Sequence, residues 1–482
     1  MSFRPLEAST HTAVPSRSRV VRIARPGGVA GRVFVASTLA LIMLHLGQSF
    51  LGIRTPGLIF GLVGGAALSL GLLLGAKLIP RLFATAFLLA GTAILLTQQV
   101  AVASALPTLA EFRNLVAIIV LVPIVGLIFE VRRYGDSLLA LAGRWTATEV
   151  RLTSAISVLA ALVGAMASLA SLVVVYETLR TQAREHERWQ RLLTNATLRG
   201  YTASFTWAPS SSAVAVALNF TNASIADYLP KGLGLAGLIL LLQAGFSVWE
   251  RREPTWQPTL RPVERRVAVR ESLEFLSLLL LLLGAVVAVG EITRRPLVDV
   301  VPIVCLAFAV GFFVLSGRSV HLVHRLAHYL TKDIPNKASE VALILSAGVL
   351  VGSLRLTGLS QQLAAGFQSV LGPNPAALVV ALPVVMIVLG LLGVPPMVTL
   401  LLYTGTLDPA MIAVAPGVFT LALSFGVAVA MMVSPYTVPT FLLSAVTGRS
   451  SVQIGLQWNW AFGLASFVVA LIYLLLLLPL PG

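Results

Sequence analysis

The sequence predicts an all-α polytopic membrane protein with about 11 transmembrane helices and two opposed re-entrant hairpins in an inverted repeat. Three observations predict this class. Hydrophobic residues form 57% of the 482 residues and charged residues only 11%, which is too little charge to cover a soluble surface. Apolar stretches of about 20 residues, the length of a spanning helix, recur along the chain. The 34 basic residues, against 19 acidic ones, gather between alternate stretches, as they do on the cytoplasmic side of membranes.

The N-terminal region predicts the orientation of the chain. Residues 1–28 are rich in Ser, Thr, Arg and Pro and predict a disordered basic tail in the cytoplasm. Arginines ahead of the first apolar stretch keep this end on the cytoplasmic side of the cell inner membrane. Membrane topology therefore explains the formal net charge of +15, and we expect no nucleic-acid partner. The lone cysteine, Cys305, excludes an internal disulfide and a Cys-rich metal site.

The apolar stretches define the predicted order of the chain. A group of N-terminal transmembrane helices, 29–110, precedes two transport repeats, 111–250 and 272–482, which a cytoplasmic linker at 251–271 joins. Arginine-rich connections alternate with connections that carry little or balanced charge, and this alternation assigns each connection to a side. The predicted spans are 33–51, 56–76, 82–106, 114–131, 201–222, 228–249, 272–290, 298–316, 340–357, 411–446 and 458–480.

Two apolar stretches do not fit as single spans and predict re-entrant hairpins. Residues 152–178 have arginine-rich flanks on both sides, so both flanks belong in the cytoplasm. The stretch is too short for two spans, which need about 40 residues. Residues 376–407 contain Pro395 and Pro396 in mid-segment, and adjacent prolines break a helix. The flanks of this second stretch are uncharged, so its hairpin enters from outside, and the C-terminus also lies outside.

The two halves of the chain align with each other at an offset of 226 residues. Pro209 then meets Pro435, and Gly164 meets Gly390. Charge topology gives the two units opposite orientations in the membrane, so they form an inverted repeat. Each repeat holds a hairpin, a proline-broken helix and a plain apolar helix, and the predicted broken helices are 193–222 and 411–446.

Inverted repeats with interrupted helices at matching positions are typical of secondary transporters. A half-helix that begins in mid-membrane directs free N–H groups and the positive end of its dipole at a cavity. Hydroxyls and unwound carbonyls beside the break can coordinate Na⁺, the candidate coupling ion. The same hydroxyls have a structural alternative, which is to satisfy backbone groups freed by proline. The predicted substrate-binding residues are Ser210, Ser211, Ser212, Ser434, Thr437, Ser168, Pro395 and Pro396, and the helix-break residues are Pro209, Pro435 and Pro439.

These features resemble the ion transporter superfamily, which includes the divalent anion–sodium symporters. The resemblance covers about residues 110–480 and rests on two opposed hairpins, each followed by a broken helix, and on the span count. It implies elevator-type alternating access, with a solute held between hairpin tips and helix breaks. The tips depart from the Ser-Asn-Thr pattern of the dicarboxylate symporters. The segments that carry the resemblance are Ala208-Pro209-Ser210-Ser211, Ser434-Pro435-Tyr436-Thr437, Gly393-Val394-Pro395-Pro396 and Asn336 to Glu340.

The predicted function is secondary active transport of a small polar, preferably anionic, solute across the inner membrane by alternating access, coupled to Na⁺ or H⁺. A membrane enzyme acting on a lipid-linked glycan is the first alternative, but it would need a long outer loop bearing Arg, His or Glu. A non-transporting accessory subunit is the second. We expect no catalytic residue, metal site or other cofactor. The expected partners are the lipid bilayer, a small-molecule or ion substrate and a second copy of the chain in a homodimer.

Several ionisable residues admit two interpretations. His45 lies in the first predicted span, where an ionisable group indicates function unless it is a neutral, hydrogen-bonded histidine. Glu340 and Asp408 lie near the ends of membrane segments, where they serve proton coupling or mark the interface. Arg199 is expected near the cytoplasmic interface, where it guides an anion or sets the topology.

Overall fold

The computed structural model describes residues 28–131, 134–142, 148–183, 187–250, 263–371, 374–407 and 414–478. All regular secondary structure in these ranges is helical, which confirms the all-α class. The predicted tail up to residue 27 and residues 251–262 of the predicted linker lie outside the described ranges. The rest of that linker overlaps α13, which begins at Arg265.

Eleven helical stretches of the described chain are long and apolar enough to cross a membrane, in agreement with the predicted number. One member differs. The first arm of the predicted hairpin, Glu149–Ala167, qualifies by length, whereas 201–222 is interrupted and does not. The stretches are Val29–Leu51, Gly57–Leu74, Leu78–Thr97, Val102–Leu127, Glu149–Ala167, Ile225–Trp249, Arg265–Thr293, Leu297–Leu315, Ala338–Leu356, Pro416–Thr447 and Gln453–Leu476.

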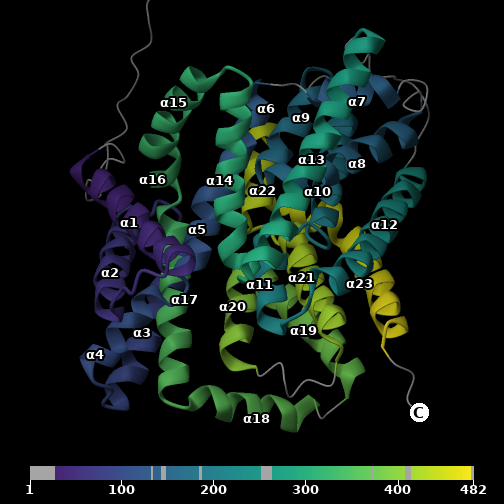
Figure 1. Ribbon diagram of the computed structural model, residues 1–482. Coiled ribbons are helices and arrows are strands. Elements are labelled where there is room, and N and C mark those ends of the chain that lie inside the picture. The colour runs from purple at the N-terminus through teal and green to yellow at the C-terminus, as the bar shows by residue number, and fades with distance from the viewer. Residues whose placement is uncertain are drawn as a thin grey trace, which may run out of the picture.

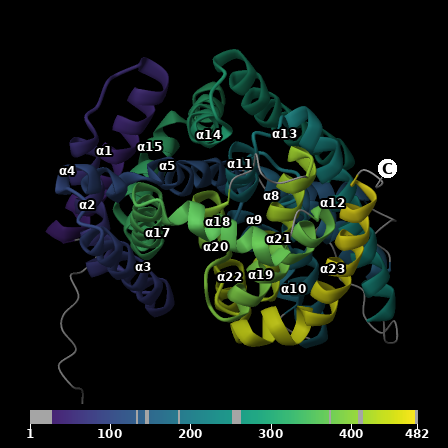
Figure 2. The same ribbon diagram turned by 90° about the horizontal axis from the view of Figure 1, so that it is seen from below.

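The N-terminal helices form a group with α17 on one side of the molecule. Helices α1 (Val29–Leu51), α2 (Gly57–Leu74) and α3 (Leu78–Thr97) pack together, and α17 (Ala338–Leu356) lies against α2 and α3. Figures 1 and 2 show this group beside the remaining helices. A helix from the second predicted repeat therefore belongs spatially with helices that precede the first.

The next span is irregular because prolines interrupt it. Its 3₁₀ segments η1 and η2 each have a proline in the first turn, Pro107 and Pro123, where a residue without an N–H group is tolerated. The elements are α4 (Val102–Ala105), η1 (Leu106–Ala110), α5 (Arg113–Leu121), η2 (Val122–Leu127) and α6 (Ile128–Val131).

The remaining helices contain two hairpins and two broken helices. In Figure 1 the α8–α9 pair lies in the upper half of the molecule and the α19–α20 pair in the lower half. The first half has α7 (Tyr134–Ala142), α8 (Glu149–Ala167), α9 (Ala170–Ala183), α10 (Glu187–Ser204), α11 (Ser212–Thr221) and α12 (Ile225–Trp249). The second has α13 (Arg265–Thr293), α14 (Leu297–Leu315), α15 (Ser319–His328), η4 (Tyr329–Asp333), α16 (Ile334–Asn336), α18 (Leu359–Leu371), α19 (Pro375–Leu391), α20 (Pro396–Thr406), α21 (Pro416–Val433), α22 (Val438–Thr447), η6 (Gln453–Gln457) and α23 (Trp458–Leu476).

Close helix contacts join the first hairpin to the first broken helix. A Cβ atom at Gly200 of α10 would lie 2.1 Å from the carbonyl oxygen of Ser157 in α8. A Cβ atom at Gly164 of α8 would lie 2.8 Å from Ser204 Oγ in α10. Small residues at such positions let membrane helices approach closely. The hairpin arm and the broken helix therefore pack almost backbone to backbone.

The same two contacts recur 226 residues later, between α19 and α21. Gly426 faces Pro383, whose Cα would lie 2.9 Å from an added Cβ, and Gly390 faces Ala430, whose Cβ would lie 3.2 Å away. The two halves thus use one packing scheme, in which a glycine on each partner permits the approach.

Arg199, which we expected near the cytoplasmic interface, is a buried arginine with several polar partners. Its side chain is 1% exposed inside the helix bundle. The guanidinium donates to Asn459 Oδ1 at 2.7 Å, Gln243 Oε1 at 2.8 Å and Glu250 Oε1 at 3.0 Å, and lies 4.5 Å from the Phe462 ring centroid. A buried charge needs such partners. These partners belong to α12, to the residue after it and to α23. The charges of the loops therefore do not reveal them.

The packing at Gly200 gives a testable prediction for stability. Gly200→Ala places a methyl group against a backbone oxygen, so we expect the free energy of unfolding to fall by about 1–3 kcal/mol. The detergent-solubilised protein should then lose its folded elution peak at a lower temperature than the wild type.

Gly245→Ala is the matched control, since nothing lies within 4 Å of a Cβ at this α12 position. Alanine also has the higher helix propensity, so this variant should be at least as stable as the wild type. Equal stability of the two variants would contradict the packing scheme.

Candidate functional site

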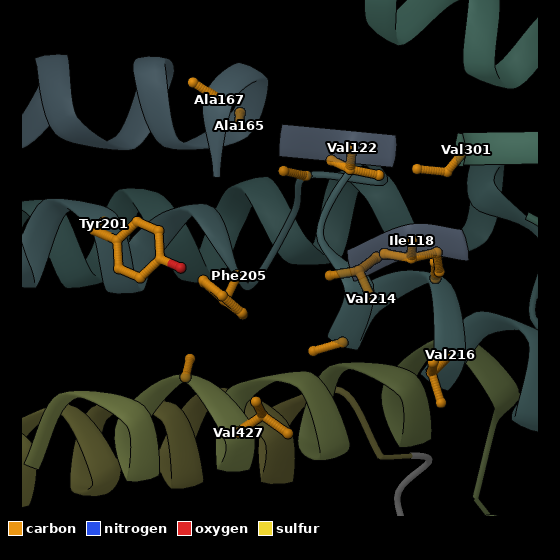
Figure 3. Packing of buried hydrophobic residues seen from close by; sticks show 14 of the residues in the cluster. Ile118, Val122, Ala165, Ala167, Tyr201, Phe205, Val214, Val216, Val301 and Val427 are labelled. Atoms are coloured by element: carbon orange, nitrogen blue, oxygen red, sulfur yellow. The ribbon is translucent and has the colours of Figure 1, made fainter. Parts of the chain in front are cut away.

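A cavity of about 160 Å³ lies where both hairpin tips and both helix breaks come together. Its upper and lower walls come from the turn between α8 and α9 and the turn between α19 and α20. Apolar side chains of α5, η2, α10 and α17 close the sides, including Ile118, Val122, Phe205 and Leu343. Figure 3 shows Ile118 beside Val214 of α11 in the packed core, which also contains Val122 and Phe205.

Most of the sequence-predicted site residues line this cavity. Ser211 and Ser434 are buried beside it but do not line it. Those that do are Ser168 at the first tip, Pro395 and Pro396 at the second, Ser210 and Ser212 at the first break, and Thr437 at the second break.

Each helix break is hydrogen-bonded to the hairpin of its own half. Ser210 Oγ donates to the carbonyl oxygen of Ala165 in the last turn of α8. Ser434 Oγ donates to the carbonyl oxygen of Gly390 in the last turn of α19, at 2.7 Å. Both bonds satisfy a backbone group that has no water available inside a membrane. They also fix each hairpin tip against its break.

The remaining hydroxyls differ in how free they are to bind a solute. Thr437 Oγ1 donates to the carbonyl oxygen of Met431 at 2.7 Å, so it satisfies backbone at the end of α21. Ser168 turns the first tip with a left-handed φ of 49°. Ser211 precedes α11, and its buried hydroxyl has no hydrogen-bond partner within the described chain. Some hydroxyls are therefore already bonded to the backbone and others are not. Thr437 belongs to the first kind, which serves the structure of the break.

The prolines fall at different points of the breaks. Pro209 and Pro435 are buried within the two non-helical segments. Pro439 is instead the second residue of α22, where its missing N–H group costs no helical hydrogen bond. Pro439 therefore begins the half-helix rather than interrupting it.

Charged residues at the cavity were not among the predicted binding residues. Lys77, which precedes α3, and Lys337 and Glu340, at the start of α17, line it. Lys77 Nζ lies 2.7 Å from Glu340 Oε1. Burial lowers the pKa of Lys337, and the nearby Glu340 carboxylate opposes this shift. Two lysines against one glutamate give this end of the cavity a positive balance.

Sequence reasoning missed both lysines because they are distant in sequence from the helix breaks. Only the packing of α3 on α17 brings Lys77 beside Lys337. The available signal was a lysine directly at the end of an apolar segment, which is also the usual place for a topology-setting charge.

Comparison with protein families decides the class of the protein. Residues 202–480 match the family model described as "Tripartite ATP-independent periplasmic transporter, DctM component". The chain belongs to this DctM family. It is therefore a multi-pass membrane transporter component, of a family of the inner membrane, and not an enzyme. The matched residues begin in α10 and include both helix breaks and the second hairpin.

The DctM match also refines the sequence resemblance. It agrees with a membrane transporter, but it does not support the divalent anion–sodium symporters that the resemblance named. No curated protein matches the chain.

Two solved structures are similar to the chain at low identity. Neisseria gonorrhoeae MtrF, described with a class of antimetabolite efflux pumps, is 13% identical with a TM-score of 0.46, over 86% of this chain and 98% of that chain. The Alcanivorax borkumensis YdaH transporter is 13% identical with a TM-score of 0.46, over 76% of this chain and 88% of that chain.

The bond between Ser434 and Gly390 gives a prediction for the second hairpin. Ser434→Ala leaves the Gly390 carbonyl without this partner, at a cost of about 1 kcal/mol. We expect amide hydrogen exchange at the tip, residues 392–394, to become about fivefold faster. Exchange measured by mass spectrometry on the solubilised protein tests this.

Ser316→Ala is the control, because the Ser316 hydroxyl bonds only carbonyls of its own helix. It should leave exchange at the second tip unchanged. Unchanged amide hydrogen exchange at the second tip of Ser434→Ala would mean that this bond does not hold the hairpin.

Proposed function

We propose that the chain is the solute-translocating component of a secondary transporter that moves a small anionic solute across the inner membrane. Transport would be coupled to an ion, Na⁺ or H⁺, and would proceed by alternating access. The single observation that carries the proposal is the cavity between both hairpin tips and both helix breaks, which Lys77, Lys337 and Glu340 also line.

The cavity's chemistry supports a small anion. At about 160 Å³ it is smaller than the roughly 300–1,000 Å³ of pockets for drug-sized ligands. Its walls are mainly apolar, and charges attract more strongly where water is excluded. The lysine ammonium groups can donate to a carboxylate or a similar group, and Ser212 adds a hydroxyl to the lining.

The arrangement of the hairpins supports alternating access. Each tip is bonded to its own break, and the two hairpins lie in opposite halves of the molecule. A Cβ at Gly393 of the second tip would lie 3.8 Å from both Ile79 and Phe83 of α3. Movement of the hairpin units past the α1–α3 and α17 group would therefore open and close the cavity. The N-terminus would lie in the cytoplasm and the C-terminus outside.

The family description suggests the wider assembly. It names a tripartite, ATP-independent periplasmic transporter, so we extend the proposal to further components that act with this chain. We also propose that the chain forms a homodimer, with Na⁺ or H⁺ as the coupling ion.

Binding of anions to the purified full-length chain tests the proposal. We expect succinate, pyruvate, phosphate or sulfate to raise the thermal stability, because a ligand that binds only the folded state stabilises it. Glycerol, a neutral polyol, should have no effect. Addition of NaCl at constant ionic strength separates sodium linkage from screening.

Variants of the charged residues that line the cavity test whether positive charge there binds the anion. Lys77→Gln and Lys337→Gln should each weaken anion affinity about tenfold, the loss of one charge-assisted hydrogen bond of about 1.5 kcal/mol. Glu340→Gln should not weaken it. Lys332→Gln, at an exposed position outside the cavity, is the control. Equal affinity in all four variants, or stabilisation by glycerol alone, would contradict an anion site at these lysines.

A further inference from the structure

A buried histidine–carboxylate pair lies outside the solute cavity and outside the proposed binding residues. Asp299, in the first turn of α14, is 8% exposed, and His45 of α1 is 5% exposed. Asp299 Oδ1 lies 3.1 Å from His45 Nε2. Ser49 Oγ donates to Asp299 Oδ2 at 2.6 Å. Ionisable groups buried in membrane proteins usually mark ion or proton pathways.

A separate cavity of about 330 Å³ reaches this pair. His45, Ser49 and Asp299 line it, and its lining comes from four stretches of the chain, 45–49, 111–114, 219 and 295–299. The pair is therefore buried in the bundle and open to a polar space, as exchange of a small ion requires. The other lining residues are Gln48, Glu111, Arg113, Asn114, Asn219, Arg295, Pro296 and Val298.

The charges around the pair come from each neighbouring segment. Arg113, at the start of α5, acts on Asp299 through its positive charge and stacks 4.4 Å from the Phe60 ring centroid. Arg295, just before α14, adds a second positive charge to the cavity, and Glu111 adds a negative one. Helix α13 contributes Glu291, which with Arg294 lines the adjoining cavity, and α11 contributes only the neutral Asn219.

The geometry defines how the pair can hold a proton. A carboxylate only accepts hydrogen bonds, so the neutral imidazole donates its Nε2 proton to Asp299. His45 Nδ1 makes no hydrogen bond within the described residues and can take one proton from solvent. The pair then changes from a net charge of −1 to zero, without any other bond forming or breaking. Release of that proton restores the first state.

Helix α11 connects this pair to the solute cavity. Ser212, its first residue, lines the solute cavity, and Asn219, near its end, lines the cavity of the pair. The two positions are about 10 Å apart along the helix axis. Segment Val102–Leu127 makes a second connection, since Arg113 faces the pair and Ile118 the solute.

We infer that His45 and Asp299 form a proton-binding site whose occupancy is coupled to binding of the anionic solute. This inference rests on the proposed function and deepens it, because it names H⁺ as the coupling ion and places its site. No cluster of three metal-ligating side chains occurs among the described residues. The pair itself offers one carboxylate and one imidazole, a set suited to a proton.

Proton uptake on solute binding tests the inference on the purified full-length chain. Potassium succinate is added to weakly buffered, sodium-free protein containing a pH indicator, and thermal stabilisation reports succinate binding in parallel. By linkage, a tenfold coupling moves the occupancy of a half-protonated site by a little under one half, so at that pH we expect the wild type to take up about 0.4 proton per chain. Asp299→Asn and His45→Gln should still bind succinate but take up no proton.

His328→Gln provides the matched control. His328 Nδ1 lies 3.6 Å from Asp333 Oδ2 in a pair exposed to solvent, so this variant should behave as the wild type. From pH 6 to pH 8, the succinate affinity of the wild type and of this control should fall about tenfold, because binding takes up a proton. A change of this size is within the range of coupled sites. The affinity of Asp299→Asn should not change.

The outcomes separate the two proposals. Succinate binding with the same proton uptake in all variants, or affinity that responds to Na⁺ and not to pH, overturns the proton site alone. Loss of the folded elution peak in both pair variants assigns the pair to structural stability and also overturns it. Absence of binding by the wild type for every anion of the panel overturns the proposed function, and the proton site with it.

Discussion

The structure depends on one constraint, which is that polar backbone groups freed by hairpins and helix breaks need partners inside a membrane. Two hydroxyls meet it at matching places. Ser210 bonds the Ala165 carbonyl, and Ser434 bonds the Gly390 carbonyl at 2.7 Å. Because each bond joins a break to the hairpin of its own half, satisfying the backbone also fixes the hairpin tip. The solute cavity is the space that remains between the two fixed tips.

Charge is scarce in this protein, and the structure places it where it has most effect. Lys77, Lys337 and Glu340 line the solute cavity together with mainly apolar side chains. A second cavity surrounds Asp299 and His45, and α11 lines both, with Ser212 at the solute cavity and Asn219 at the second. A single short half-helix therefore touches both the space for the solute and the space for the proposed proton. This arrangement gives a physical route for coupling between them.

Local signals were enough to predict the all-α class, the number of candidate spans and the places where helices are interrupted. Paired prolines and arginine-rich flanks act on the chain within a few residues, so they can be read from the sequence. Contacts between distant segments cannot. Lys77 meets Glu340 only because α3 packs on α17. Arg199 is buried because its partners lie in or beside α12 and α23. The connection after α17 forms a helix, α18. This helix was not predicted, because the connection carries no charge that would indicate its structure.

The central claim is that two inverted halves send their hairpins into one cavity from opposite sides. Arg151, at the base of the first hairpin, and Asn374, at the base of the second, are both exposed. The native Cys305 is fully buried and gives little background. Arg151→Cys and Asn374→Cys can therefore be labelled with a membrane-impermeant maleimide in intact cells and in inside-out vesicles. The account predicts labelling of Arg151→Cys only in inside-out vesicles and of Asn374→Cys only in intact cells. Labelling of both from the same side would contradict it.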